Sequence, residues 1–187
     1  MNAIITGSNR GIGKAMVEAF AAAGYNVWAC ARKATPEHEA WLNDTASHNG
    51  VWIKAIYFEM SDPESVNNGI KQILDENLTI DVLVNNAGIS TVGLLSMSKV
   101  DDIRKLFEVN YFAMLQIIQK VSKKMARQKK GAIINMGSIA GIEPQPGKIA
   151  YGSSKAAVMM MTKCLAKELG PVGIRVNALP LVRLKRK

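Results

Sequence analysis

The sequence has 187 residues, of which 48% are hydrophobic, and its 24 lysines and arginines outweigh 15 acidic residues to give a net charge of +9. This length and composition predict a single globular domain and exclude a helical membrane protein, because no apolar run approaches the roughly 20 residues that span a bilayer. The two cysteines and two histidines lack metal-ligand spacing, and the basic residues come without a nucleic-acid-binding signature, so we expect neither a metal nor a nucleic acid.

A glycine-rich turn follows the first predicted strand. Residues Asn2 to Ile5 form a short apolar strand with no leader sequence before it, so we expect a cytoplasmic protein. The turn leads into a helix that runs to about Ala23. Its backbone N–H groups and the helix dipole would bind phosphate, although any tight strand-to-helix turn needs glycine. The candidate phosphate-binding residues are Gly7, Ser8, Asn9, Arg10, Gly11, Ile12 and Gly13.

The end of the second strand indicates which dinucleotide such a loop would bind. Tyr25 to Ala31 form this strand, and Arg32 and Lys33 follow it directly. An acidic residue here would bind a ribose 2′-hydroxyl, whereas arginine accommodates a 2′-phosphate. With Arg10 in the loop, these cations favour NADP(H) over NAD(H), although exposed arginines are often merely solvated.

Two further strands end in polar residues. Val51 to Phe58 lead into Glu59 and Met60, and Asp62 with Pro63 then starts a helix as N-cap and first helical residue. The fourth strand, Ile80 to Val84, runs into Asn85, Asn86, Ala87 and Gly88. This tetrapeptide is either an ordinary Asn/Gly turn or part of the ligand site, and its place directly after a buried strand favours the site.

A long helix is predicted from about Val100 to Ala126, and Asn110 interrupts its apolar face. A buried amide needs hydrogen-bond partners. Asn110 is therefore either a satisfied core residue or a functional one.

Three proton-handling side chains surround the next strand-to-helix connection. Ser138 follows the apolar strand Ala132 to Met136, and Tyr151 and Lys155 lie four residues apart at the start of a buried helix. They therefore share a face, and the ammonium would favour the charged form of the phenol. A Tyr-xxx-Lys pair alone is usually a helix surface with a snorkelling lysine, but Ser138 and the other motifs favour acid–base chemistry.

Strands and helices alternate as far as a sixth strand, Gly173 to Leu179. Such alternation predicts an α/β fold, a Rossmann-like doubly wound parallel sheet of about six strands with helices on both faces. Residues 1–179 would form one NAD(P)-binding catalytic domain.

Together these motifs resemble the short-chain dehydrogenases/reductases, in particular their 3-oxoacyl-carrier-protein reductases, over nearly the whole chain. The resemblance implies that Asn110, Ser138, Tyr151 and Lys155 are catalytic, with Asn110 holding a water of the proton relay. It also implies that Glu59 and Met60, a partial match, contact adenine, that Asn86, Ala87 and Gly88 line the ribose, and that Tyr151 and Lys155 hold the nicotinamide ribose.

The resemblance ends after Leu179. There the family normally continues with Pro-Gly, a substrate-covering lid and a seventh strand, whereas this chain reads Pro180-Leu181-Val182-Arg183-Leu184-Lys185-Arg186-Lys187. We interpret residues 180–187 as a basic tail outside the family pattern, produced by truncation or a shifted reading frame. The sixth strand would then be an exposed edge.

Two functions fit this sequence. The first is an NADPH-dependent reductase of ketones to secondary alcohols, acting on 3-oxoacyl thioesters or on another carbonyl compound. Acyl carrier protein is a candidate partner near Lys129 and Lys130, although Val172 stands where a second basic residue is expected. A homo-oligomer would form through the helices that bear Asn110 and Lys155. The alternative is a truncated, catalytically impaired cofactor-binding or assembly module.

Overall fold

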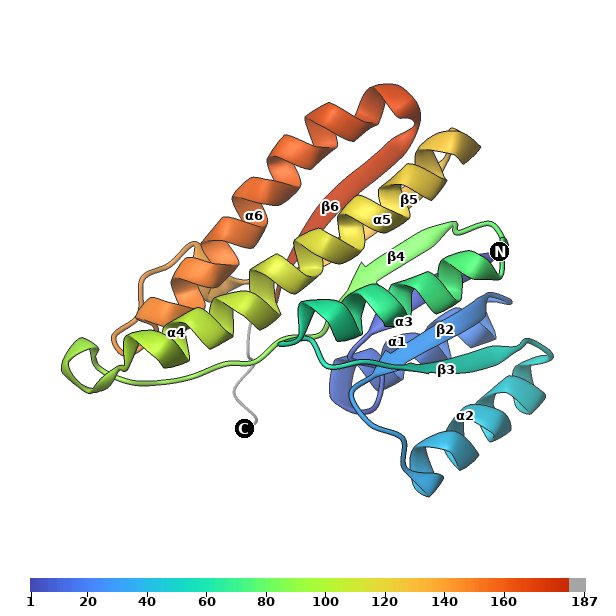
Figure 1. Cartoon of the computed structure of the whole chain (residues 1–187), viewed down its shortest axis with the longest axis horizontal. Coiled ribbons are helices and arrows are strands. Elements are labelled where there is room, and N and C mark those ends of the chain that lie inside the picture. Colours follow the sequence, from blue (N-terminus) through green and yellow to red (C-terminus); the bar gives the residue numbers. More distant parts are fainter. Residues whose placement is uncertain (182–187) are drawn as a thin grey trace.

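The computed structural model describes residues 1–181 and contains one parallel sheet (Figure 1). Its spatial order is β3-β2-β1-β4-β5-β6, so the chain reverses direction across the sheet between β1 and β4. The strands are β1 (Asn2–Thr6), β2 (Asn26–Ala31), β3 (Ile53–Tyr57), β4 (Val82–Asn85), β5 (Gly131–Ser138) and β6 (Ile174–Leu181). Ligands of open α/β sheets bind at the carboxyl ends of the strands beside such a reversal.

Helices cover both faces of this sheet. The helices are α1 (Gly11–Ala22), α2 (Pro36–Asn49), α3 (Pro63–Asp75), α4 (Val100–Phe107), α5 (Ala113–Gln128) and α6 (Ile149–Leu169), with short 3₁₀ turns at η1 (Leu95–Met97), η3 (Ile139–Gly141) and η4 (Gly170–Val172). Ile4 of β1 packs into the larger apolar core with α3, α5 and α6. Its neighbours Ala3 and Ile5 pack on the opposite side with α1 and α2. The predicted doubly wound architecture is confirmed.

The long helix predicted from the sequence is interrupted in the structure. A π turn, η2 (Glu108–Phe112), separates α4 from α5, and Asn110 lies within it. Single π turns inside α-helices are often found at functional sites. Within this turn, the Asn110 side chain is hydrogen-bonded to the backbone of Ile89 in the loop after β4.

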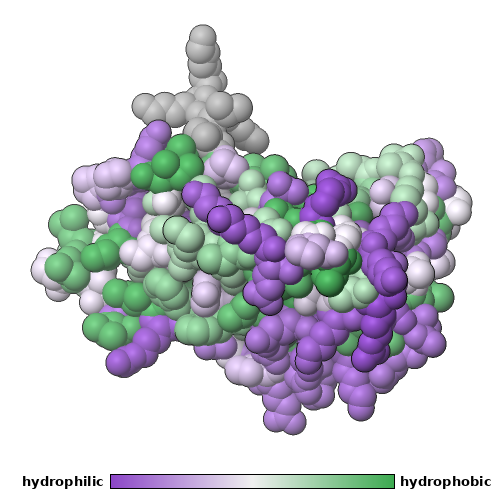
Figure 2. Space-filling model, turned by 90° about the horizontal axis from the view of Figure 1, so that it is seen from above, coloured by the Kyte–Doolittle hydropathy of each residue, from purple (hydrophilic) through white to green (hydrophobic). Residues whose placement is uncertain are grey.

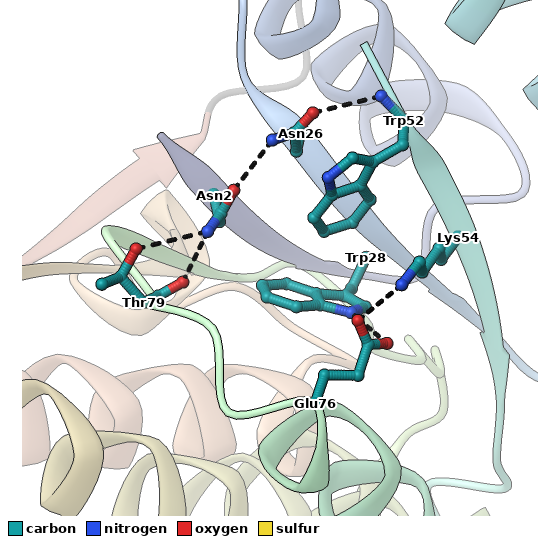
Figure 3. A network of polar contacts seen from close by, with 7 residues as sticks. All are labelled: Asn2, Asn26, Trp28, Trp52, Lys54, Glu76 and Thr79. Carbon is teal, nitrogen blue, oxygen red and sulfur yellow. Dashed lines mark hydrogen bonds and ion pairs between the residues drawn. The ribbon is translucent and has the colours of Figure 1, made fainter.

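The amino ends of the first three strands are held by a polar network that lies away from the carboxyl ends (Figure 3). Asn26 connects β1 to β3, donating to the side chain of Asn2 at 3.0 Å and accepting from the Trp52 N–H at 3.1 Å. Nearby, the buried indole of Trp28 donates to Glu76 at 3.0 Å. These bonds stabilise the scaffold without contributing to the site.

The sixth strand extends two residues beyond its predicted end at Leu179. Pro180 and Leu181, assigned to the tail, continue β6 and pair with Gly137 and Ser138 of β5. The rest of the predicted tail, 182–187, lies outside the described residues. Within them, β6 is an edge strand of the sheet, in which buried Ile174 and Val176 alternate with exposed Arg175 and Asn177. No helix of this part of the chain is long and apolar enough to cross a membrane.

Candidate active site

The glycine-rich loop is tightly packed against the end of β4. Asn86 donates from its side-chain amide to the carbonyls of Thr6 at 3.0 Å and Gly7 at 3.1 Å. A Cβ on Gly13 would collide with the Gly7 carbonyl oxygen and lie 2.6 Å from the Asn86 amide nitrogen. Gly7 itself has φ +67°, which favours glycine. The loop therefore requires glycine at positions 7 and 13 for its shape.

The N-terminus of α1 has the properties of an anion-binding site. The side chain of its N-cap residue, Arg10, makes no capping hydrogen bond, and its first turn contains no acidic residue. By contrast, Thr35 caps α2 and Asp62 caps α3, as predicted for Asp62. A Cβ on Gly11 would meet nothing within 4 Å, so there is open space beside the loop backbone. Free N–H groups and the helix dipole at such an end suit a pyrophosphate. The residues present thus fit a dinucleotide.

A cavity of about 560 Å³ opens beside this loop. Most of the predicted cofactor residues line it, namely Gly7, Asn9, Arg10, Gly11, Ile12, Gly13, Arg32, Glu59, Met60, Asn86, Ala87 and Gly88. Sequence reasoning missed several lining residues, namely Thr6, Cys30, Ala31, Phe58, Ser61, Ile89, Lys105 and Val109. Those at strand ends follow from the topology, whereas nothing in the helical pattern marks Lys105.

Four predicted cofactor residues are not in the lining of this cavity, namely Ser8, Lys33, Tyr151 and Lys155. Ser8 is buried, and both its backbone N–H and its hydroxyl donate to the Cys30 carbonyl at 3.0 Å, so it anchors the loop to β2. Lys33 is exposed. The cations that do line the cavity are Arg10, Arg32 and Lys105, and Arg32 lies 3.9 Å from the carboxylate of Glu59.

Lys155 is the most deeply buried charged side chain of the site, with 4% of its surface exposed. Its ammonium donates a 2.7 Å hydrogen bond to the Met136 carbonyl in β5 and lies 5.8 Å from the ring centroid of half-buried Tyr151. Burial lowers the pKa of Lys155 from its ordinary value of 10.5 to about 8. The structure therefore places this pair on one face of α6, against the carboxyl end of β5.

Ser138 ends β5 beside the same helix. Its hydroxyl accepts a 3.2 Å bond from the Ala140 N–H and so caps η3. An accepting hydroxyl keeps its own proton for donation to a further oxygen. Close packing brings η3 onto α6, because a Cβ on Gly141 would lie 2.8 Å from the Ala156 nitrogen and one on Gly152 would lie 2.6 Å from the Ala140 oxygen.

Asn110 is fully buried, and its amide is well satisfied. The side-chain oxygen accepts from the Ile89 N–H at 2.8 Å, while the nitrogen donates to the Ile89 carbonyl at 2.9 Å and to the Ser154 hydroxyl at 3.2 Å. Ser154 in turn donates to the Tyr151 carbonyl at 2.8 Å. Asn110 thus joins the loop after β4 to the first turns of α6, and its role in a proton relay stays a prediction.

Gly88 separates the cavity from two buried side chains, those of Asn110 and Lys155. It lines the cavity, and a Cβ built on it would lie 3.2 Å from the Asn110 side-chain oxygen and 3.7 Å from the Lys155 ammonium. The cavity is therefore contiguous with two of the predicted catalytic residues, Asn110 and Lys155. In residues 1–181 no group of three or more His, Cys, Asp or Glu side chains could hold a metal ion.

Comparison with known proteins agrees with this arrangement. The family model described as short chain dehydrogenase matches residues 1–182. The chain belongs to the short chain dehydrogenase family. A 3-oxoacyl-[acyl-carrier-protein] reductase of Synechocystis sp. is 38% identical over 176 residues, which cover 94% of this chain and 71% of that protein. As a short chain dehydrogenase, the protein is an NAD(P)-dependent oxidoreductase that acts on CH–OH or C=O groups.

Solved structures of short chain dehydrogenases have the same fold with different cofactors. One from Sphingobium yanoikuyae in complex with NADPH has a TM-score of 0.87 and 30% identity, covering 95% of this chain and 68% of that chain. An NAD⁺-bound xylitol dehydrogenase has a TM-score of 0.86 and 27% identity, covering 96% of this chain and 68% of that chain. Members of this family thus bind a nicotinamide cofactor, and the choice between NADP(H) and NAD(H) depends on the residues of this chain.

Proposed function

We propose that this short chain dehydrogenase is an NADPH-dependent reductase that converts a ketone to a secondary alcohol, with 3-oxoacyl thioesters as the first candidate substrates. One observation carries the proposal: the buried Lys155 ammonium lies behind Gly88, between the dinucleotide cavity and Tyr151. A nicotinamide that extended past Gly88 would then lie close to this cation and to the proposed proton donor, Tyr151. The name of the Synechocystis relative supports the thioester.

Two groups of cavity residues would bind two parts of the cofactor, its pyrophosphate and its 2′-phosphate. The loop and the uncapped N-terminus of α1 would bind the pyrophosphate. Arg10 and Arg32, with Lys105 from α4, would bind a 2′-phosphate through charge-assisted hydrogen bonds. These three cations outnumber Glu59 among the charged lining residues. This surplus supports NADPH over NADH.

The residues at the end of β5 would complete the reduction. Bound NADPH would supply the hydride for the ketone carbon. Ser138 would donate a hydrogen bond to the ketone oxygen, and Tyr151 would give that oxygen its phenolic proton. The resulting phenolate would be stabilised by the Lys155 ammonium and would regain a proton from solvent along the path that includes Asn110. One carbonyl group then becomes one alcohol, and one NADPH becomes NADP⁺.

We also propose two protein partners, acyl carrier protein and a second copy of this chain. Acyl carrier protein is acidic, and Lys129 and Lys130 at the end of α5 would offer it a positive surface. A second copy of the chain would pack on the outer faces of α5 and α6, where Phe112, just before α5, and Met160 on α6 are exposed. The oxidoreductase relatives do not favour the non-catalytic alternative.

Turnover of 3-oxobutanoyl thioester, followed by NADPH consumption, tests the proposed reductase. The wild-type chain is compared with Tyr151→Phe, which keeps the ring and removes the proton donor. We expect the variant to lose a factor of about 10²–10⁴ in kcat while still binding NADPH. Unchanged turnover in the variant, or no reduction of any ketone by the wild type, would refute the proposal.

A further inference from the structure

Lys148 brings a second ammonium to Tyr151. Its Nζ lies 5.4 Å from the ring centroid of Tyr151 and 3.4 Å from the hydroxyl of Ser90, to which it donates. Ser90 belongs to the loop after β4, two residues beyond Gly88. The lysine therefore connects this loop to the start of α6, directly beside the proposed proton donor.

The charge of Lys148 is not neutralised by its surroundings. No carboxylate lies within 4 Å of its ammonium in the described part of the chain, although the side chain is half-buried. It occupies the N-cap position of the 21-residue α6, whose first turn has no acidic residue. A cation is disfavoured there, because the helix dipole is positive at its N-terminus. Lys155 adds a further positive charge 5.8 Å from the same ring.

Lys148 is among the residues that line a second cavity, of about 480 Å³. Its lining includes the apolar side chains of Leu95, Ile142 and Ile149. The acidic residue in this lining, Glu143, is exposed to solvent. Figure 2 shows apolar side chains gathered at one end of the molecule, the end at which η1 lies in Figure 1. Exposed Val92, Leu94 and Met97 surround Leu95 in the sequence there. The lining of this cavity therefore combines apolar side chains with Lys148.

We propose that Lys148, with Ser90, binds an acidic group of the substrate next to the reacting carbonyl. The chain would then select ketones with a carboxylate at that position over neutral esters or thioesters, and place the apolar remainder along Leu95, Ile142 and Ile149. The inference rests on the proposed reductase function and changes the preferred substrate within it. It explains why a cation lies where the helix dipole opposes it and where no carboxylate of residues 1–181 pairs with it.

Two probes that differ only in charge test this subsite, 3-oxobutanoate and its methyl ester. The measured quantity is the acid-to-ester ratio of kcat/KM in the wild type, Lys148→Met, Lys148→Arg and Ser90→Ala. Lys71→Met, on the exposed surface of α3, is the control for the same charge change. We expect Lys148→Met to lower the ratio by about 10- to 100-fold through the KM of the acid, Lys148→Arg to restore most of it, and Ser90→Ala to lower it less.

A binding measurement tests the acidic-group subsite independently of the proposed reductase activity. Calorimetric titration of 3-oxobutanoate in the presence of NADP⁺ requires no turnover, and its affinity should fall with Lys148→Met by the same factor as kcat/KM. Lys148-dependent binding without reduction of any ketone would support the subsite and refute the reductase. Equal affinity in the wild type and Lys148→Met, or an unchanged acid-to-ester ratio, would overturn the subsite while leaving the reductase to stand on its own test.

Discussion

The ammonium of Lys155 and the carbonyl of Met136 are joined by a 2.7 Å hydrogen bond. Met136 precedes Ser138 by two residues in β5, and Lys155 follows Tyr151 by one helical turn in α6. This single bond therefore fixes the relative position of the strand that carries the hydroxyl and the helix that carries the phenol. It also compensates in part for the burial of the cation.

The first prediction concerns stability and pH. Burial lowers the pKa of Lys155 to about 8, against 10.5 when unfolded. Between these values the unfolded chain binds more protons, so this group makes the folded state more stable as pH rises. Relative to Lys155→Met, the wild type should gain roughly 3 kcal/mol at most from pH 8 to pH 10.5. Urea unfolding of both proteins without cofactor measures this difference, and a flat or falling difference would contradict it.

A second prediction concerns cofactor selectivity. Replacing Arg10 and Arg32 together by Gln should raise the KM for NADPH by about 10- to 100-fold and affect NADH much less, because a 2′-phosphate loses its charged donors. Steady-state kinetics with both cofactors measures the change. Lys33→Gln is the matched control, since Lys33 lies outside the cavity lining. An equal rise for NADPH and NADH would contradict the assignment.

A third prediction concerns the packing of the loop. Gly13→Ala should lower the free energy of unfolding by about 1–3 kcal/mol, because its Cβ collides with the Gly7 carbonyl. It should also abolish NADPH binding, since the loop must shift. Gly170→Ala, whose Cβ would meet nothing within 4 Å, is the control. Chemical denaturation and fluorescence titration with NADPH measure both effects, and NADPH binding by a folded Gly13→Ala protein would refute the loop assignment.

A fourth prediction concerns acid sensitivity away from the site. Burial, assisted by Lys14 and opposed by Glu39, lowers the pKa of His38 below 6.5. The unfolded chain therefore binds a proton first as pH falls through 6.5, which destabilises the folded state. The wild type should lose more stability than His38→Gln between pH 7 and pH 5, as measured by thermal unfolding. His48→Gln is the control, and identical acid profiles for wild type and His38→Gln would contradict the prediction.

The sheet and most of its helices could be predicted because each short apolar run, such as Ala132 to Met136, ends at a glycine or polar turn, which determines the element locally. The π turn at Asn110 could not, because it reflects bonds to Ile89 and Ser154, both distant in the sequence. In the loop, the sequence indicates which residues are present but not their orientation, so it does not reveal that the hydroxyl of Ser8, a candidate phosphate-binding residue, bonds to the Cys30 carbonyl.

Some charged residues of the site could likewise be predicted from the sequence, and others could not. Tyr151 and Lys155 could be paired from their spacing, because both lie on one helix. Lys105 and Lys148 reach their places through tertiary packing of α4 and of the loop before α6, and isolated lysines in a basic chain give no signal of that. The bond between Lys155 and Met136 likewise depends on the packing of α6 against β5.

The most direct measurement follows the hydride itself. NADPH carrying deuterium at the transferred position of the nicotinamide is incubated with 3-oxobutanoyl thioester and the protein, and the product is examined by mass spectrometry and NMR. The account predicts one deuterium on the carbinol carbon of the 3-hydroxy product with the wild type and almost no product with Tyr151→Phe. Product without deuterium at that carbon, or unreacted thioester in the presence of wild-type protein with bound NADPH, would contradict it.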